Sequence, residues 1–113
     1  MAESGKLRTE RDATDLIGET LGRGDRMVVI PVERLDEEFF RLRTGIAGAF
    51  LQKFVTYRVR VVIVGDISAH IEKSDALRDF VHESNRGDHV WFLADRNELE
   101  ARITAVETRC QVK

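Results

Sequence analysis

The sequence predicts a small single α/β domain with a mainly parallel sheet of three or four strands joined by helical crossovers. Three short apolar runs, rich in β-branched residues, occupy residues 27–32, 59–64 and 89–94. Such runs are typical of strands that are buried on both faces. Helical patterns separate them, and crossovers of that kind join parallel strands. A chain of 113 residues is long enough for one domain with its own core.

Helical periodicity marks the segments around the strands. Apolar residues recur on one face in residues 12–21, 35–42, 45–57, 75–85 and 95–103. Residues 65–72 are predicted to form a loop, and residues 6–8 are the candidate for a short fourth strand. We therefore expect an N-terminal segment at 1–8, one domain at 9–103 and a polar tail at 104–113.

Composition narrows the class of protein. The chain is 42% hydrophobic and 34% charged, with 18 basic and 20 acidic residues and a net charge of -2. That balance argues against binding nucleic acid through clustered cations. A single cysteine, Cys110, excludes an internal disulfide. No apolar run is long enough to cross a bilayer, and the N-terminus has no signal-peptide core. We expect a cytoplasmic protein that binds no membrane.

A glycine-rich helix start is the first candidate site. Thr44 and Gly45 open the helix predicted at 45–57, Gly48 follows one turn later, and Arg43 precedes them. Free amides at a helix N-terminus favour an anion, and Arg43 adds a cation. The alternative is structural: Thr44 is then a helix cap, and Gly45 and Gly48 allow close packing on the sheet.

The segment after the middle strand is the second candidate. Asp66, Ser68 and His70 follow the predicted carboxyl end of that strand, the edge where open parallel sheets bind ligands. Asp66 and Ser68 equally suit a turn. A Gly-x-Ser-x-Gly hydrolase elbow is missing, so no catalytic residue is predicted. The histidines lack the spacing of metal ligands, and no cofactor motif occurs, so no metal and no cofactor are expected.

A candidate partner surface involves two other segments. Phe39 and Phe40 are adjacent, so one ring points away from any single helical stripe and would mark a binding surface. The alternative wedges both rings between helices. Glu83, Asn85 and Arg86 end the helix at 75–85, either as a polar contact patch or as a helix C-terminus.

Several segments together resemble the bacterial family catalogued as domain of unknown function 4180. They are residues 44–48 (TGIAG), 51–54 (LQKF), 64–68 (VGDIS), 77–80 (LRDF) and 83–87 (ESNRG). The resemblance covers roughly residues 6–103 and implies no established activity. Members usually begin with a further strand before the position of Ser4, and this chain is expected to start after it.

The order of predicted elements is more loosely similar to the STAS domain of anti-sigma factor antagonists. In those proteins a serine or threonine before a helix-opening glycine is phosphorylated, and Thr44 with Gly45 stands in the similar place. Leu42 and Arg43 replace the usual Asp-Ser pair. The resemblance implies a regulatory domain with Thr44 as its switch.

These observations leave three hypotheses. The first is a cytoplasmic regulatory or protein-interaction module without catalytic activity, whose partner is another protein. The second is a small-ligand or nucleotide-phosphate binding protein, or an enzyme, that uses the carboxyl edge of the sheet. The third is a structural homodimer whose edge strands pair. A pocket between Thr44 and Asp66 would favour the second hypothesis over the first.

Overall fold

A parallel three-stranded sheet forms the centre of the protein. The computed structural model describes the backbone of residues 7–111 and the side chains of residues 7–105. In this part of the chain the strands are β1 (Met27–Pro31), β2 (Arg60–Val64) and β3 (Val90–Leu93), which neighbour one another in that order. Both strand pairs are parallel. The predicted α/β class and parallel sheet are confirmed.

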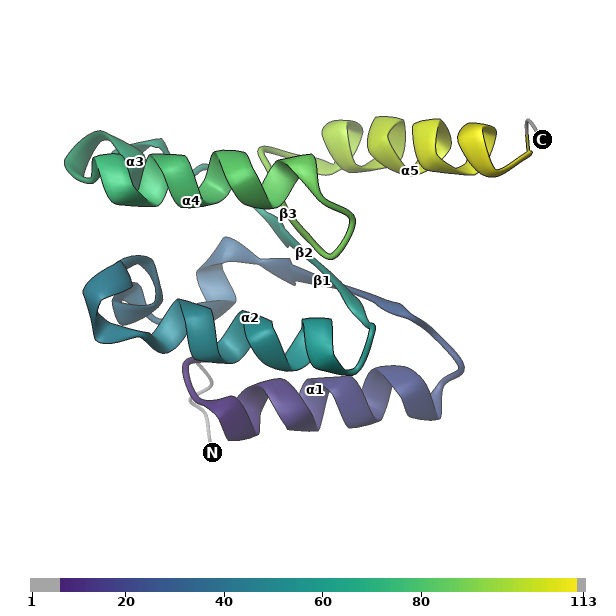
Figure 1. The fold of residues 1–113 in the computed structure, drawn as a ribbon, viewed down its shortest axis with the longest axis horizontal. Coiled ribbons are helices and arrows are strands. Elements are labelled where there is room, and N and C mark those ends of the chain that lie inside the picture. Colours follow the sequence, from purple (N-terminus) through teal and green to yellow (C-terminus); the bar gives the residue numbers. More distant parts are fainter. Residues whose placement is uncertain (1–6, 112–113) are drawn as a thin grey trace.

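Helices precede, connect and follow the strands (Figure 1). They are α1 (Glu10–Gly22), α2 (Ile46–Thr56), α3 (Ser68–Lys73), α4 (Asp75–Arg86) and α5 (Arg96–Gln111). Three short 3-10 turns lead from β1 into α2, namely η2 (Val32–Arg34), η3 (Glu37–Phe40) and η4 (Leu42–Thr44). The first crossover therefore consists of η2, η3, η4 and α2, and the second consists of α3 and α4.

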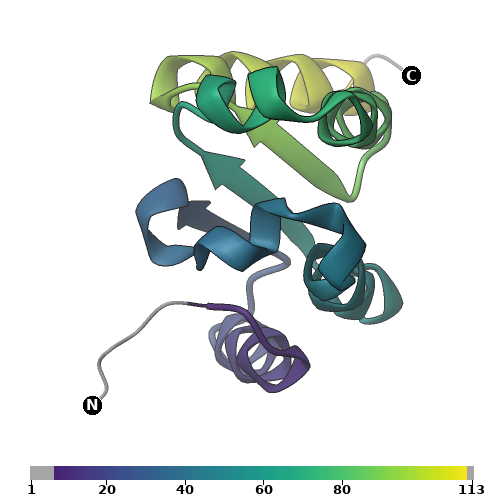
Figure 2. The ribbon, with the colours of Figure 1, turned by 90° about the vertical axis from the view of Figure 1, so that its left-hand side faces the viewer.

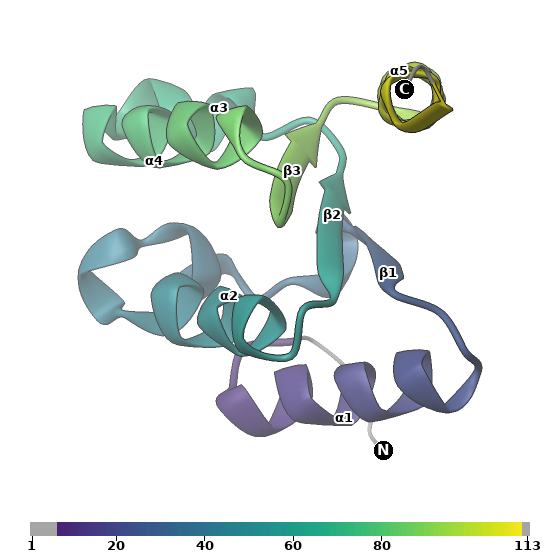
Figure 3. The same ribbon diagram turned by 45° about the vertical axis from the view of Figure 1, so that its right-hand side comes forward.

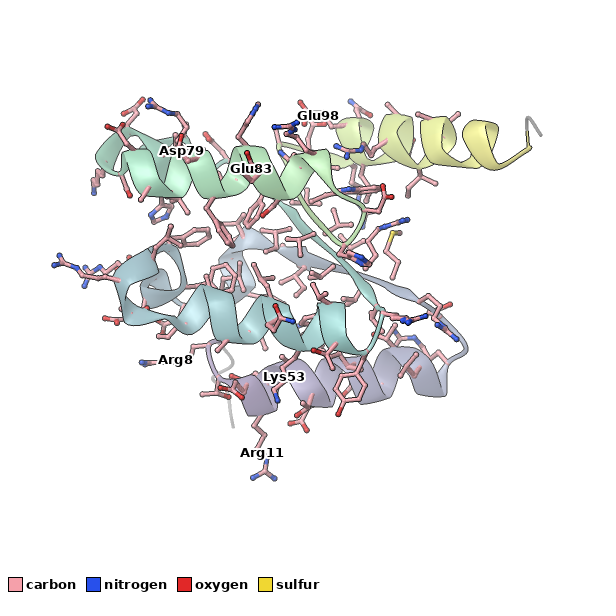
Figure 4. The ribbon with its side chains drawn as sticks, viewed as in Figure 1. Arg8, Arg11, Lys53, Asp79, Glu83 and Glu98 are labelled. Atoms are coloured by element: carbon pink, nitrogen blue, oxygen red, sulfur yellow. The ribbon has the colours of Figure 1, made fainter. Side chains whose placement is uncertain are left out.

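The two crossovers cover the same face of the sheet. Figure 3 shows α2, α3 and α4 on one side of the strands and α5 on the other. Right-handed crossovers between successive neighbouring strands give this arrangement. α1 packs beside α2, and the Lys53 Nζ atom lies 3.5 Å from a carboxylate oxygen of Glu10 across the two helices (Figure 4).

The opposite face has its own apolar cluster, which Trp91 dominates. Val62, Trp91, Leu93 and Leu99 are all buried there. The guanidinium carbons of Arg60 and Arg102 lie 4.5 and 4.4 Å from the centre of the Trp91 ring. The indole Nε1 donates a 2.8 Å hydrogen bond to the Gly87 carbonyl. Two cation–π contacts and one hydrogen bond therefore fix the ring on this face.

The segment at 65–72 is not the loop that was predicted. Helix α3 occupies residues 68–73, after a turn in which an Asp66 carboxylate oxygen accepts hydrogen bonds from the Ser68 amide (2.9 Å) and hydroxyl (2.6 Å). Ile67 and Ile71, four residues apart, both pack into the main core. One short helix gives too few turns for its periodicity to stand out in the sequence.

Other boundaries also differ from the sequence expectations. The short helix expected at 35–42 is a pair of 3-10 turns, with Asp36 accepting a 2.9 Å bond from the Glu38 amide at the start of η3. Leu7 forms one parallel bridge with Leu35 rather than a fourth strand, and Lys6 lies outside the described residues. Helix α5 continues through Gln111, into the segment expected to be a tail.

Candidate functional site

A cavity of about 520 Å³ opens between the two crossovers. Its walls come from η3 and η4, which follow β1, and from α3 and α4, which follow β2, so it lies at the carboxyl ends of parallel strands. Figure 2 looks onto this side, with the 3-10 turns of the first crossover below α3 and α4. We call it the crossover cavity. Its lining residues are Glu37, Phe40, Arg41, Leu42, Arg43, His70, Lys73, Ser74 and Ala76.

The cavity wall carries more positive than negative charge. Arg41, Arg43 and Lys73 contribute three cations, and Glu37 is the one acid among the lining residues. Arg41 is partly neutralised by Glu38, at 3.6 Å. Within the described part of the chain, Arg43 and Lys73 form no ion pair and no side-chain hydrogen bond, and both are exposed to solvent. These two cations, one from each crossover, are available to a ligand.

Two stacked aromatic side chains, Phe40 and His70, line the cavity beside these charges, and we call this pair the aromatic floor. The His70 imidazole stacks on the Phe40 ring with centroids 4.3 Å apart and planes inclined by 14°. Phe40 in turn contacts Phe39 edge to face, and Phe39 contacts Phe50 in the same way. The stack thus joins α3 to η3 and rests on the main core. It holds one wall of the cavity in place.

Helix α4 begins at the cavity. Its cap is Ser74, whose hydroxyl oxygen accepts a 3.1 Å hydrogen bond from the Leu77 amide. The amides of Asp75 and Ala76, in the first turn, have no hydrogen-bond partner among the described residues. Such first-turn amides point out of the helix and favour an oxygen anion. Ser74 and Ala76 both line the cavity.

The structure therefore divides the residues predicted at the carboxyl edge. Arg43 and His70 both line the cavity, whereas the other members of the set do not, namely Thr44, Gly45, Gly48, Asp66 and Ser68. The cavity is therefore not a pocket between Thr44 and Asp66, although it lies at the same edge of the sheet. The sequence did not identify three of the charged lining residues, Arg41, Lys73 and Glu37, as members of a site. They have no local sequence signal, because the cavity arises only when two crossovers about 30 residues apart pack together.

Asp66 and Ser68 form a self-contained turn. Hydrogen bonds from the Ser68 hydroxyl and from the Ser68 amide hold the pKa of the exposed Asp66 carboxyl below its usual value. The two hydrogen bonds to the ionised Asp66 carboxylate stabilise the folded protein. Because the pKa is lowered, this stabilisation is present above the ordinary pKa of aspartate and is lost as the pH falls through the lowered value.

We expect the Ser68→Ala substitution to raise the pKa of Asp66 towards its ordinary value. Only the hydroxyl bond is removed, and the bond from the backbone amide at position 68 remains, so the shift is partial. An NMR titration of the Asp66 carboxyl carbon measures it, with Asp79 on the outer side of α4 as a reference carboxyl (Figure 4). An unchanged Asp66 titration would contradict the assignment of the hydroxyl as the main cause.

The segment at 44–48 differs in detail from its predicted form. Gly45, with φ of 78°, is the residue before α2, and Thr44 lies in η4. The Thr44 hydroxyl accepts a 3.2 Å bond from the Ile46 amide and donates to the carbonyl of Arg41 at 2.8 Å. The N-cap of α2 is therefore Gly45 and not Thr44 as predicted, although the Thr44 hydroxyl accepts from the first amide of the helix. The prediction that Gly48 allows close packing on the sheet is wrong, because a Cβ at this position would meet nothing within 4 Å.

The candidate partner surface is only partly exposed. Of the two alternatives for Phe39 and Phe40, the structure shows the second, with both rings buried. Asn85 turns inward, where its amide oxygen accepts from the Phe92 amide at 2.7 Å and its amide nitrogen donates to the Phe92 carbonyl at 3.1 Å. Glu83 and Arg86 are exposed on α4 and lie 3.6 Å apart as an ion pair.

The described residues bring together no group of three or more side chains suited to hold a metal ion. Among the helices described, none combines the length and apolar character that a membrane span requires.

The comparison with known proteins identifies the family. No curated protein and no solved structure gives a significant match to the chain. One family model matches residues 1–103, which include all three strands, both crossovers and every residue of the crossover cavity. The protein belongs to the family described as domain of unknown function 4180.

Proposed function

We propose that this protein is a non-catalytic binding module that holds a small organic anion in the crossover cavity. The observation that carries the proposal is that two different crossovers bring Arg43 and Lys73 to one cavity, where neither cation has an ion-pair partner among the residues that the structure describes. A volume of about 520 Å³ suits a small organic molecule. The position, at the carboxyl ends of parallel strands, is the usual ligand edge of open α/β sheets.

A regulatory protein-interaction module with Thr44 as its switch is the second candidate. Its support is that Thr44 is exposed in the turn beside Arg43, where a phosphate would be accessible to a partner protein. The buried rings of Phe39 and Phe40 weigh against a docking surface centred on them. This second candidate is the regulatory role that the resemblance to the STAS domain implies.

The Arg43→Ala substitution is expected to weaken binding of small organic anions about tenfold. Loss of one charge-assisted hydrogen bond accounts for an effect of that size. Isothermal titration calorimetry against a panel of aromatic and aliphatic carboxylates and phosphates measures it. NMR spectra recorded with each ligand are expected to show changes in the amide chemical shifts of His70 and Ser74, which line the cavity.

Arg11→Ala is the matched control, because Arg11 is exposed on α1 and points away from the strands (Figure 4). Its affinities should equal those of the unmodified protein. A panel in which every anion fails to bind would overturn the ligand-binding proposal and leave the protein-interaction candidate.

A further inference from the structure

We infer that the anionic group recognised in the crossover cavity is a phosphoryl group of a small organic phosphate, held between Arg43 and Lys73. This inference rests on the proposed function and narrows its ligand class. It follows from the number of donors, from the different elements that carry them and from the character of the remaining wall.

The available positive charge matches a dianion. Arg43 and Lys73 have no ion-pair partner among the described residues, whereas Arg41 is partly neutralised by Glu38. A phosphate monoester carries between one and a half and two negative charges near pH 7. A monocarboxylate carries one, so it would leave one of the two cations without a partner.

The donors belong to three different elements, η4, α3 and α4. Arg43 comes from the first crossover and Lys73 from the end of α3, while Ala76, in the first turn of α4, lines the cavity and has an amide without a partner in the described part of the chain. A phosphoryl group has three terminal oxygens arranged as a pyramid, and it can accept from three directions at once. The two oxygens of a carboxylate lie in one plane with its carbon. The arrangement therefore favours phosphate over carboxylate.

The rest of the cavity requires an organic body. Phe40 with its stacked His70, Leu42 and Ala76 line it beside the charged groups. A phosphoryl group alone fills only a small part of about 520 Å³. The acid Glu37 repels a second anionic group and can accept a hydrogen bond from a hydroxyl or amine of that body.

The test compares two aromatic probes of similar size and charge, phenyl phosphate and phthalate, with benzoate and inorganic phosphate beside them. Titration calorimetry on the full chain is expected to show phenyl phosphate binding at least tenfold more tightly than phthalate or benzoate. Inorganic phosphate should bind more weakly than phenyl phosphate, because it leaves the apolar wall unfilled.

The variants Arg43→Ala and Lys73→Ala should each weaken phenyl phosphate about tenfold, while Arg11→Ala leaves its affinity unchanged. Thermal unfolding checks that each variant is folded, which is expected because both side chains are exposed.

The outcomes separate the two proposals. Phthalate or benzoate binding as tightly as phenyl phosphate overturns the phosphoryl inference and leaves the proposed function standing. Phenyl phosphate binding that survives both substitutions within twofold also overturns the inference, because the group then lies elsewhere. Binding of none of the four probes, with no binding across the wider panel, overturns both.

Discussion

The Gly65→Ala substitution is expected to lower the free energy of unfolding by about 3 kcal/mol. Gly65 directly follows β2 and has a φ of 147°, a conformation that residues with a Cβ rarely adopt. A Cβ added there would lie 2.6 Å from Cγ2 and 2.8 Å from Cβ of Val32. The strain and the overlap add, so the effect exceeds that of either alone.

The backbone cannot move aside to relieve this overlap. The Gly65 amide donates a 2.9 Å hydrogen bond to the Leu93 carbonyl, which extends the pairing of β2 with β3. Val32 belongs to η2, the first turn after β1. A shift at Gly65 would therefore disturb both sheet pairings at once.

Urea unfolding followed by the fluorescence of Trp91, the single tryptophan, measures the change. Gly18→Ala is the matched control, because Gly18 lies within α1 and a Cβ there meets nothing within 4 Å. That substitution should raise stability by about 0.5–1 kcal/mol through helix propensity. Equal stability of the two alanine variants would show that the close approach at Gly65 is not a constraint.

Phe39→Ala is expected to cost about 3–5 kcal/mol, the usual range for truncating a buried phenylalanine. Phe39 is 1% exposed and contacts Phe40 and Phe50 edge to face, with ring centroids 5.3 and 5.5 Å apart. The loss is a large part of the total stability of an ordinary domain, which is about 5–15 kcal/mol.

A milder substitution at Phe39 tests whether the stacked pair Phe40 and His70 shapes the crossover cavity. Phe39 does not line the cavity but supports Phe40, on which His70 stacks. We use Phe39→Leu for this measurement, since it keeps the variant folded, and expect weaker binding of any anion that the unmodified protein binds. Tyr57→Ala is the control, because Tyr57 is 50% exposed at the end of α2. Unchanged affinity in Phe39→Leu would show that the floor does not depend on Phe39.

The sheet was predictable because its signal is local. Each strand contains a continuous run of apolar residues, such as VVIV at positions 61–64 of β2, and a helical segment separates each strand from the next. Parallel pairing follows from those connections. Helix α3 was missed because it has six residues, and the glycine and turn-forming residues before it favour a loop.

The candidate site was predictable only in part, for a geometric reason. Arg43 was identified as a cation before a predicted helix start, and His70 because it follows the carboxyl end of the middle strand, and both line the cavity. Lys73 and Arg41 were not, because their place depends on how η4 and α3 pack. No local pattern in the sequence marks that packing. The similarity of the element order to the STAS domain stays a prediction.

The order of the strands has a consequence for synthesis on the ribosome. Each strand pairs with the next strand along the chain, so the sheet can grow from β1 to β3 as the chain emerges. The face that holds Trp91 is different, because its cover includes Leu99 of α5, which follows β3 in the chain. In nascent chains that have released β3 but not α5, Leu99 is not yet present to cover Val62, Trp91 and Leu93. Apolar side chains exposed in this way attract chaperones or aggregate.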